Sequence, residues 1–191
     1  MRYMLLSPAD QHTLLEQLSA MPAFLDEAFG GVSAADARAE GADGVSAVEQ
    51  CWHLADLERE GYAVRIRRLL TEVEPALPDF DGERVAHERN YKSLSLEDGL
   101  EAFRRARAEN LAALRALSAS EWERRGTQEG VGRVGLCDIP LMMAEHDAAH
   151  RAEIEEWRSG QRAKGKGQRR GPTSPLPFDL CPLTCLLYIN R

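Results

Sequence analysis

The segment "MMAEHDAAHRAEIEEW", residues 142–157, is the part of the sequence that decides the fold. Its apolar residues recur every three or four positions, which predicts an amphipathic helix that packs one face against a core. His146 and His150 lie at the centre of that face, one helical turn apart. Because a buried polar group without a partner costs roughly 1–3 kcal/mol, two histidines stacked there are expected to share a third group.

Three further stretches repeat this helical pattern, and almost none of the chain alternates apolar with polar residues as strands do. The four expected helices begin at residues that commonly cap helix N-termini: Ser7, Ser46, Ser95 and Asp138. The first is expected to kink at Pro22 and end at Gly30, the second to end near Glu72 and the last near Arg158. Residues 129–137 are glycine-rich and can form a small hairpin. The sequence therefore predicts an all-α, four-helix bundle.

One domain is enough for a chain of 191 residues. We expect the bundle to occupy residues 1–159 and residues 160–191 to form a long, loosely ordered C-terminal tail. The tail opens with the basic, glycine-rich run "GQRAKGKGQRRG" and continues with prolines and no clear period. The net charge of −7 disfavours binding of the bundle to nucleic acid or to an anionic membrane.

The sequence also indicates where the protein resides. It has no stretch of eighteen apolar residues, so no transmembrane span is expected, and its first apolar run is too short for a signal peptide. Four cysteines are too few for a disulfide scaffold in a chain of this length. Cys181 and Cys185 lack further ligands at a useful spacing, so free thiols in a reducing compartment are expected. These features predict a cytoplasmic protein.

The second expected helix carries a histidine that can complete a site. On a helical wheel Glu49, His53, Asp56 and Glu60 form a polar column between two apolar walls, and they are expected to face the bundle interior. The remaining polar residues of this helix are expected to face solvent, among them Gln50, Glu58, Arg65 and Arg68. The two histidines outside these helix faces, His12 and His87, are expected on the surface.

His53, His146 and His150 together can hold a divalent transition metal. Neutral imidazoles suit zinc, nickel, copper or ferrous iron better than magnesium or calcium, and zinc is the first candidate. Three protein ligands leave a position for water, which is typical of a catalytic rather than a purely structural zinc site. The alternative is that the histidines are hydrogen-bonded core residues without a metal.

Two motifs in this order resemble those of the DinB-like superfamily. They are "HLADLERE" at residues 53–60 and "GVGRVGLCDIPLMMAEHDAAHRAEI" at residues 130–154. The resemblance covers residues 45–158 and implies a four-helix bundle with one metal-binding histidine from the second helix and an HxxxH pair from the last. The C-terminal tail has no counterpart in the family pattern.

The resemblance can be followed residue by residue. His53, His146 and His150 match the histidines of the family motifs, and Asp56 matches the aspartate of the first motif. Glu153 stands where the family usually has glutamine, which adds a carboxyl group near the site. Asp56 and Glu153 are therefore candidates for orienting a ligand imidazole or carrying a proton.

The resemblance leaves the reaction open. Members of the superfamily are similar in their site more than in their chemistry, and the implied activities are metal-dependent hydrolysis of a small molecule or transfer of a low-molecular-weight thiol to an electrophile. The alternative is a non-enzymatic, metal-stabilised stress-response protein or a bundle that dimerises through its apolar faces. An HExxH-type metalloprotease is disfavoured because Asp147 stands where that mechanism needs glutamate.

The third expected helix adds two candidate substrate-binding residues. Arg107 and Asn110 fall in line with Phe103 and Leu114 on its apolar stripe. An arginine there can bind an anionic substrate or a thiol cofactor. Alternatively, it reaches to solvent or pairs with a carboxylate of the core.

Overall fold

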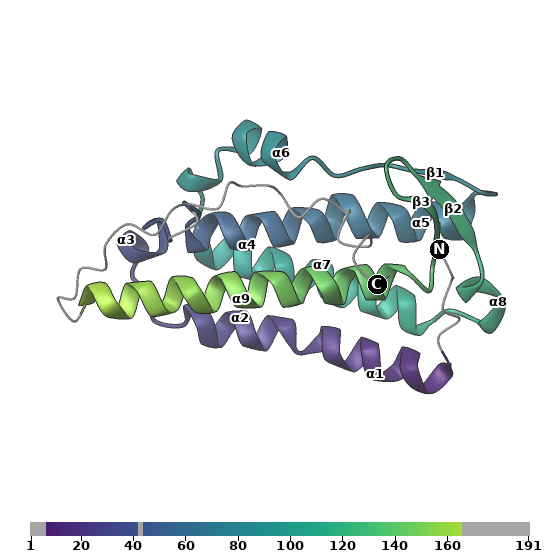
Figure 1. The fold of residues 1–191 in the computed structure, drawn as a ribbon, viewed down its shortest axis with the longest axis horizontal. Coiled ribbons are helices and arrows are strands. Elements are labelled where there is room, and N and C mark those ends of the chain that lie inside the picture. The colour runs from purple at the N-terminus through teal and green to yellow at the C-terminus, as the bar shows by residue number, and fades with distance from the viewer. Residues whose placement is uncertain (1–6, 42–43, 166–191) are drawn as a thin grey trace, which may run out of the picture.

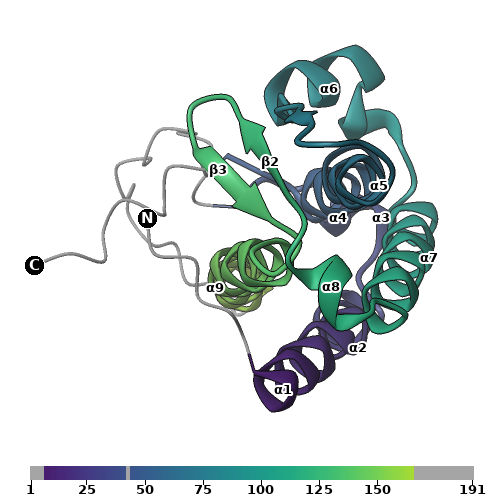
Figure 2. The same cartoon turned by 90° about the vertical axis from the view of Figure 1, so that its right-hand side faces the viewer.

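The structure, a computed structural model, describes residues 7–41 and 44–165. Its helices are α1 (Pro8–Ser19), α2 (Met21–Phe29), α3 (Ala34–Ala37), α4 (Ala47–Asp56), the π-helix η1 (Leu57–Tyr62), α5 (Ala63–Thr71), α6 (Gly82–Arg89), the 3-10 helix η2 (Tyr91–Ser93), α7 (Leu96–Arg115), α8 (Ala119–Trp122) and α9 (Ile139–Gly165). Four helical columns form the bundle: α1 with α2, α4 with η1 and α5, α7, and α9 (Figures 1 and 2). The predicted four-helix bundle is confirmed.

Three of these columns begin at a capping residue that the sequence predicts. The Ser7 hydroxyl accepts from the third backbone amide of α1, and Ser95 does the same for α7. Ser46 and Glu49 form a reciprocal capping box at the start of α4. The first column is broken between α1 and α2, just before Pro22, because a proline inside a helix cannot donate the amide that the preceding turn needs.

A three-stranded sheet closes one end of the bundle. Strands β2 (Arg125–Gln128) and β3 (Gly132–Gly135) form an antiparallel hairpin. The sequence predicts a hairpin within residues 129–137, whereas its first strand lies before that range. Strand β1 (Ala76–Leu77) pairs with β2 in parallel, which the sequence does not predict because two residues carry no readable period. A Cβ at Gly126 would lie 2.5 Å from the Pro75 carbonyl oxygen, so this pairing requires glycine.

The connection between the second and third columns sets the topology. α4 and α5 run in the same direction as α7, so the chain has to travel back along the bundle between them (Figure 1). It does so on the outer side of α4 and α5, through β1, residues 78–81, α6 and η2. This return segment covers the side of α4 that carries His53.

A π-helical turn interrupts the second column. A π turn accommodates one residue more than an α turn, so every side chain beyond it is rotated by about 100° relative to a continuous α-helix. The expectation that Gln50, Glu58 and Arg65 face solvent is wrong, because these residues are 5%, 1% and 0% exposed. The extra residue explains Arg65, which lies beyond the π turn. Glu58 lies within the turn and binds Arg107 and Asn110, and Gln50 precedes the turn and is buried because it bonds to α9.

An ion cluster occupies the middle of the core. Arg107 of α7 donates to both carboxylate oxygens of Asp147 in α9 at 2.7 Å, to Glu58 of η1 at 2.9 Å and to the Leu18 carbonyl of α1 at 3.0 Å. Asn110, one turn further along α7, donates to the second oxygen of Glu58 at 2.7 Å. Arg107 therefore links all four columns of the bundle at one point.

The last helix continues beyond its expected end near Arg158 to Gly165. The rest of the expected tail, residues 166–191 with Cys181 and Cys185, lies outside the described residues. Cys51 and Cys137 are buried free thiols.

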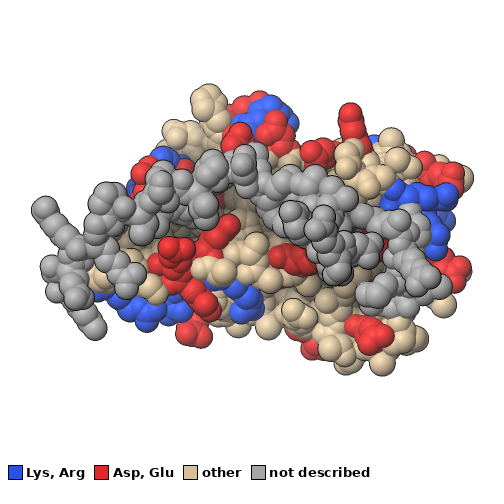
Figure 3. Space-filling view, in the orientation of Figure 1, with Lys and Arg blue, Asp and Glu red and all other residues tan. Residues whose placement is uncertain are grey.

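No helix of the described part is long and apolar enough to span a membrane. On the face drawn in Figure 3, the visible Lys and Arg side chains lie among acidic ones.

We predict that Arg107→Met lowers the free energy of unfolding by about 3–5 kcal/mol, because it leaves two buried carboxylates without their counter-ion. The matched control is Arg104→Met, on the same helix. Arg104 is 45% exposed and pairs with Asp26 and Glu101 at the surface, so its loss is expected to cost about 1 kcal/mol or less. Urea unfolding followed by circular dichroism measures both values, and equal small losses would show that the ion cluster does not hold the bundle together.

Candidate metal centre

Three histidines from two columns meet inside the bundle. α4 supplies His53, and α9 supplies His146 and His150. The Nε2 atom of His146 lies 3.3 Å from Nε2 of His53 and 3.1 Å from Nε2 of His150. One ring nitrogen from each histidine lies within 4.8 Å of the others. Within the described ranges this is the one group of three or more histidine, cysteine or carboxylate side chains that is close enough to share an ion.

The spacing of these nitrogens fits a transition metal. Two nitrogens that each lie 2.0–2.1 Å from a tetrahedral zinc ion are about 3.3 Å apart. The distances of 3.3 and 3.1 Å from His146 to its neighbours match this value. Three imidazoles without carboxylate or thiolate ligands suit zinc, nickel or iron better than magnesium or calcium. The donor set therefore fits a divalent transition metal.

The surroundings keep two of these imidazoles neutral. Burial and, to a smaller extent, the neighbouring His150 together lower the pKa of His53 to about 3, and Glu153 opposes them. Burial also lowers the pKa of His146 well below its usual value, helped by His150, His53 and the positive charges of Arg107 and Arg65. A neutral imidazole is the form that binds a metal, so these ligands are ready at neutral pH without losing a proton.

Two side chains orient His150. Its Nδ1 atom lies 2.6 Å from the Gln50 amide oxygen and 2.8 Å from a Glu153 carboxylate oxygen, and the Gln50 amide nitrogen donates to the same carboxylate at 3.1 Å. Both neighbours of Nδ1 are acceptors, so this nitrogen carries the proton and the lone pair of Nε2 points into the cluster. Burial raises the pKa of Glu153, but hydrogen bonds from His150 and Gln50 outweigh burial and hold it below its usual value. Sequence reasoning missed Gln50.

The return segment closes over His53. The Phe80 ring lies 6.0 Å from the His53 ring, centroid to centroid. A Cβ at Gly82, the first residue of α6, would lie 2.8 Å from Cε1 and 2.9 Å from Nδ1 of His53. Real side chains do not approach that closely, so only glycine lets α6 lie against the imidazole. The sequence gives no sign of this contact.

The fold and the site can now be compared with known proteins. The model of the DinB superfamily matches residues 17–154 of the chain. The chain belongs to the DinB superfamily. Among solved structures, one that is similar is YfiT from Bacillus subtilis, described as a probable metal-dependent hydrolase with an unusual four-helix bundle topology. The match has a TM-score of 0.75 and 19% identity, and it covers 88% of this chain and 94% of YfiT. At that identity the likeness shows the fold alone. A comparison with curated proteins gives no match.

Within this DinB-superfamily bundle, Asp56 lies in the interior but binds cations rather than histidines. It is fully buried, and its carboxylate accepts from Arg59, Arg89 and the Tyr91 hydroxyl, the last at 2.6 Å. Arg89 also donates to Glu60 at 2.5 Å. Because Arg89 ends α6, the Asp56 carboxylate holds in place the helix whose first residue touches His53.

Arg107 and Asn110, the two candidate substrate-binding residues, lie in the core at 1% and 4% exposed. Their hydrogen bonds go to Glu58, Asp147 and the Leu18 carbonyl. Of the roles that the sequence allows for Arg107, the structure thus shows the pairing with core carboxylates. His12 and His87 are exposed, as the sequence predicts.

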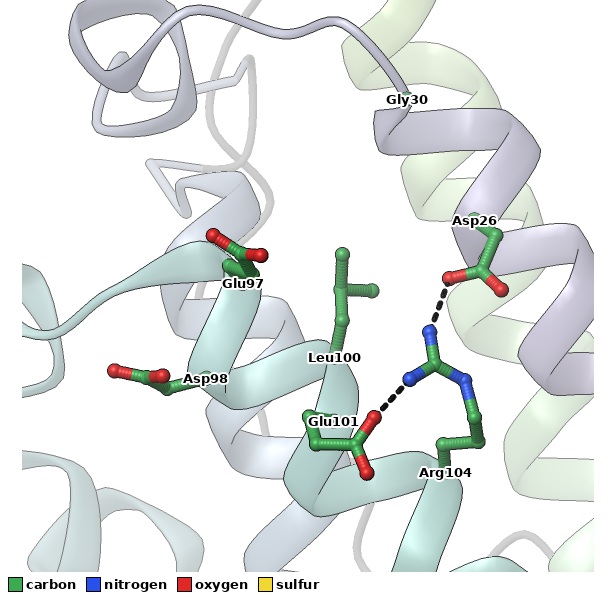
Figure 4. Close-up of a pocket in the computed structure, with 7 residues that line it drawn as sticks. All are labelled: Asp26, Gly30, Glu97, Asp98, Leu100, Glu101 and Arg104. Atoms are coloured by element: carbon green, nitrogen blue, oxygen red, sulfur yellow. Dashed lines mark hydrogen bonds and ion pairs between the residues drawn. The ribbon is translucent and has the colours of Figure 1, made fainter.

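A surface groove of about 430 Å³ lies elsewhere, between the end of α2 and the start of α7 (Figure 4). It is lined by Asp26, Gly30, Glu97, Asp98, Leu100, Glu101 and Arg104. Arg104 binds two of its carboxylates, those of Asp26 and Glu101. None of the three clustered histidines is among its lining residues, so the groove is separate from the metal centre.

We predict that Gly82→Ala weakens zinc binding at least about tenfold without removing a ligand, because the added methyl group displaces the His53 ring. Gly160→Ala is the matched control, since a Cβ there meets nothing within 4 Å and alanine favours the α9 helix. Competition with a chromophoric chelator gives both affinities. Equal zinc affinities for the two variants would show that the His53 ring tolerates a Cβ at position 82 and that α6 does not fix its position.

Proposed function

We propose that this protein is a metal-dependent enzyme that acts on a small molecule in the cytoplasm, either as a hydrolase or as a thiol S-transferase. His53, His146 and His150 hold the ion, for which zinc is the first choice and nickel or iron are the alternatives. A divalent ion bound to three imidazoles brings the pKa of a water or thiol close to neutrality and so makes a nucleophile available at neutral pH.

The observation that carries this proposal is the number of ligands. Structural zinc sites are closed by four protein ligands, whereas catalytic sites use three and keep one position for water or substrate. Among the described residues three side chains form the cluster, and two of them, His53 and His146, are only partly buried. Three protein ligands and two partly exposed imidazoles support a centre that keeps one coordination position for a small molecule.

The surrounding side chains have distinct roles in this proposal. Glu153 keeps the proton on Nδ1 of His150 and, at 44% exposed, also reaches solvent, so it is the candidate for carrying a proton to and from the site. Asp56 acts as a positioning residue, because it holds Arg89 and with it α6 against His53. Arg107 positions α9 through Asp147, which lies between the two histidines of that helix.

The non-enzymatic alternative has less support. A bundle that dimerises through apolar faces needs such a face at its surface. In the part of the chain that the structure describes, Val73 is the one large hydrophobic side chain that is exposed. The apolar helix faces are therefore used within one chain, and the open coordination position has no purpose in a metal that only stabilises the fold.

The two reaction classes are separated by assays on the zinc-loaded full chain. Ester hydrolysis is followed with p-nitrophenyl acetate, and thiol transfer with monochlorobimane and L-cysteine. We expect at least one reaction to proceed about 100-fold faster with the zinc-loaded chain than with the metal-depleted chain, and His146→Ala to abolish the gain. His12→Ala, an exposed histidine of α1, is the matched control and is expected to keep full activity. Equal rates for wild type and His146→Ala in both assays would refute an enzymatic role of the cluster for these substrates.

A further inference from the structure

Arg65 is a buried arginine whose outer nitrogens lack partners. It lies on α5, is 0% exposed, and its Nε donates to the Pro78 carbonyl at 3.1 Å. Nη1 and Nη2 are buried and donate no hydrogen bond to any of the described residues. A guanidinium carries five N–H donors, and donors left unpaired in the interior are costly, so such an arginine needs an explanation.

The counter-ion nearest to Arg65 is loosely placed. A carboxylate oxygen of Asp79 lies 3.6 Å from Nη2, which is an ion-pair distance but too long for a hydrogen bond. The Asp79 side chain is 65% exposed and belongs to the return segment, not to the bundle core. Asp79 thus partly neutralises Arg65 without occupying the donors, and a second carboxylate can take its place.

Arg65 is linked to the metal centre on two sides. On one side its guanidinium lies 5.7 Å from the centre of the Tyr62 ring, and the Tyr62 hydroxyl donates at 3.3 Å to the Met142 carbonyl, one helical turn before His146. On the other side Pro78, which accepts from Arg65, lies two residues before Phe80, which packs against His53. The same return segment therefore covers both the arginine and the histidine cluster.

We propose that Arg65 is a substrate-binding residue that receives the carboxylate of a small molecule bound at the three-histidine centre. Nη1 and Nη2 form a planar fork that matches the two oxygens of a carboxylate, and the Asp79 carboxylate lies beside that fork at 3.6 Å from Nη2. This inference rests on the proposed function, because the ligand is one that also reaches the metal. It names the substrate class as carboxylates.

The test compares two ligands that differ only in charge. The probes are 3-mercaptopropionate and 3-mercaptopropionamide, whose thiols bind zinc alike, and their affinities for the zinc-loaded full chain are measured by calorimetric titration. We expect wild type to prefer the acid at least tenfold, since hydrogen bonds to a charged group are among the strongest in proteins. Arg65→Gln is expected to remove this preference and to leave the affinity for the amide unchanged.

Further variants distinguish carboxylate binding by Arg65 from a merely structural role. Arg68→Gln removes a charge one turn away on the same helix, where Arg68 pairs with Glu72 at the surface, and is expected to keep the preference. Asp79→Asn removes the internal competitor and is expected to tighten binding of the acid severalfold. If Arg65→Gln fails to fold by circular dichroism, Asp79→Asn and Arg65→Lys decide the matter, since Arg65→Lys is expected to keep only part of the preference.

The outcomes separate this inference from the function on which it rests. A chain that takes up no zinc refutes the metal centre, and the role of Arg65 fails with it. A chain that binds zinc normally, but prefers the acid equally in wild type and Arg65→Gln, keeps its metal centre and loses only the carboxylate site. Unchanged binding of the acid in Asp79→Asn would likewise overturn the competition between Asp79 and the ligand.

Discussion

The bidentate ion pair between Arg107 and Asp147 is the interaction on which the rest of the structure depends. Asp147 stands between His146 and His150 on α9, so fixing its carboxylate fixes the rotation of that helix about its axis. Arg107 also binds Glu58, whose pKa is raised by burial, with the Arg107 charge and the hydrogen bonds from Arg107 and Asn110 opposing that rise. Separating a buried ion pair leaves an uncompensated charge in the core, which favours the helix arrangement in which Arg107 meets both carboxylates. In that arrangement the two histidines face α4.

The π turn gives the second column two separate interior faces. Before it, α4 directs His53 and Gln50 to α9. Within it, Glu58 binds Arg107, and after it the extra residue turns Arg65 toward the return segment. The topology also explains why His53 is covered. The chain has to run back across α4, and this return segment places Phe80 and Gly82 against the His53 ring.

The sequence carries the signals that are local. Capping residues such as Ser46 mark where helices begin, and the spacing of His146 and His150 places them on one core-facing stripe, so the bundle and the histidine cluster were both predictable. What was not predictable depends on partners distant in the chain. The burial of Arg65 follows from a π turn that no propensity signals, and the closeness of Gly82 to His53 follows from a return segment whose path is set by tertiary packing. The burial of Arg65 and the cover over His53 thus both depend on tertiary structure that a helical wheel does not represent.

The central claim is that three histidines form one metal centre. The most direct measurement is elemental analysis of the full chain purified without an affinity tag and incubated with zinc, nickel or ferrous ions, for wild type, His53→Ala and His146→Ala. We predict close to one transition-metal ion per chain in wild type and its loss in both variants, although the two histidines lie 93 positions apart in the sequence. A wild-type chain that remains free of metal, or variants that keep the full complement, would contradict the account.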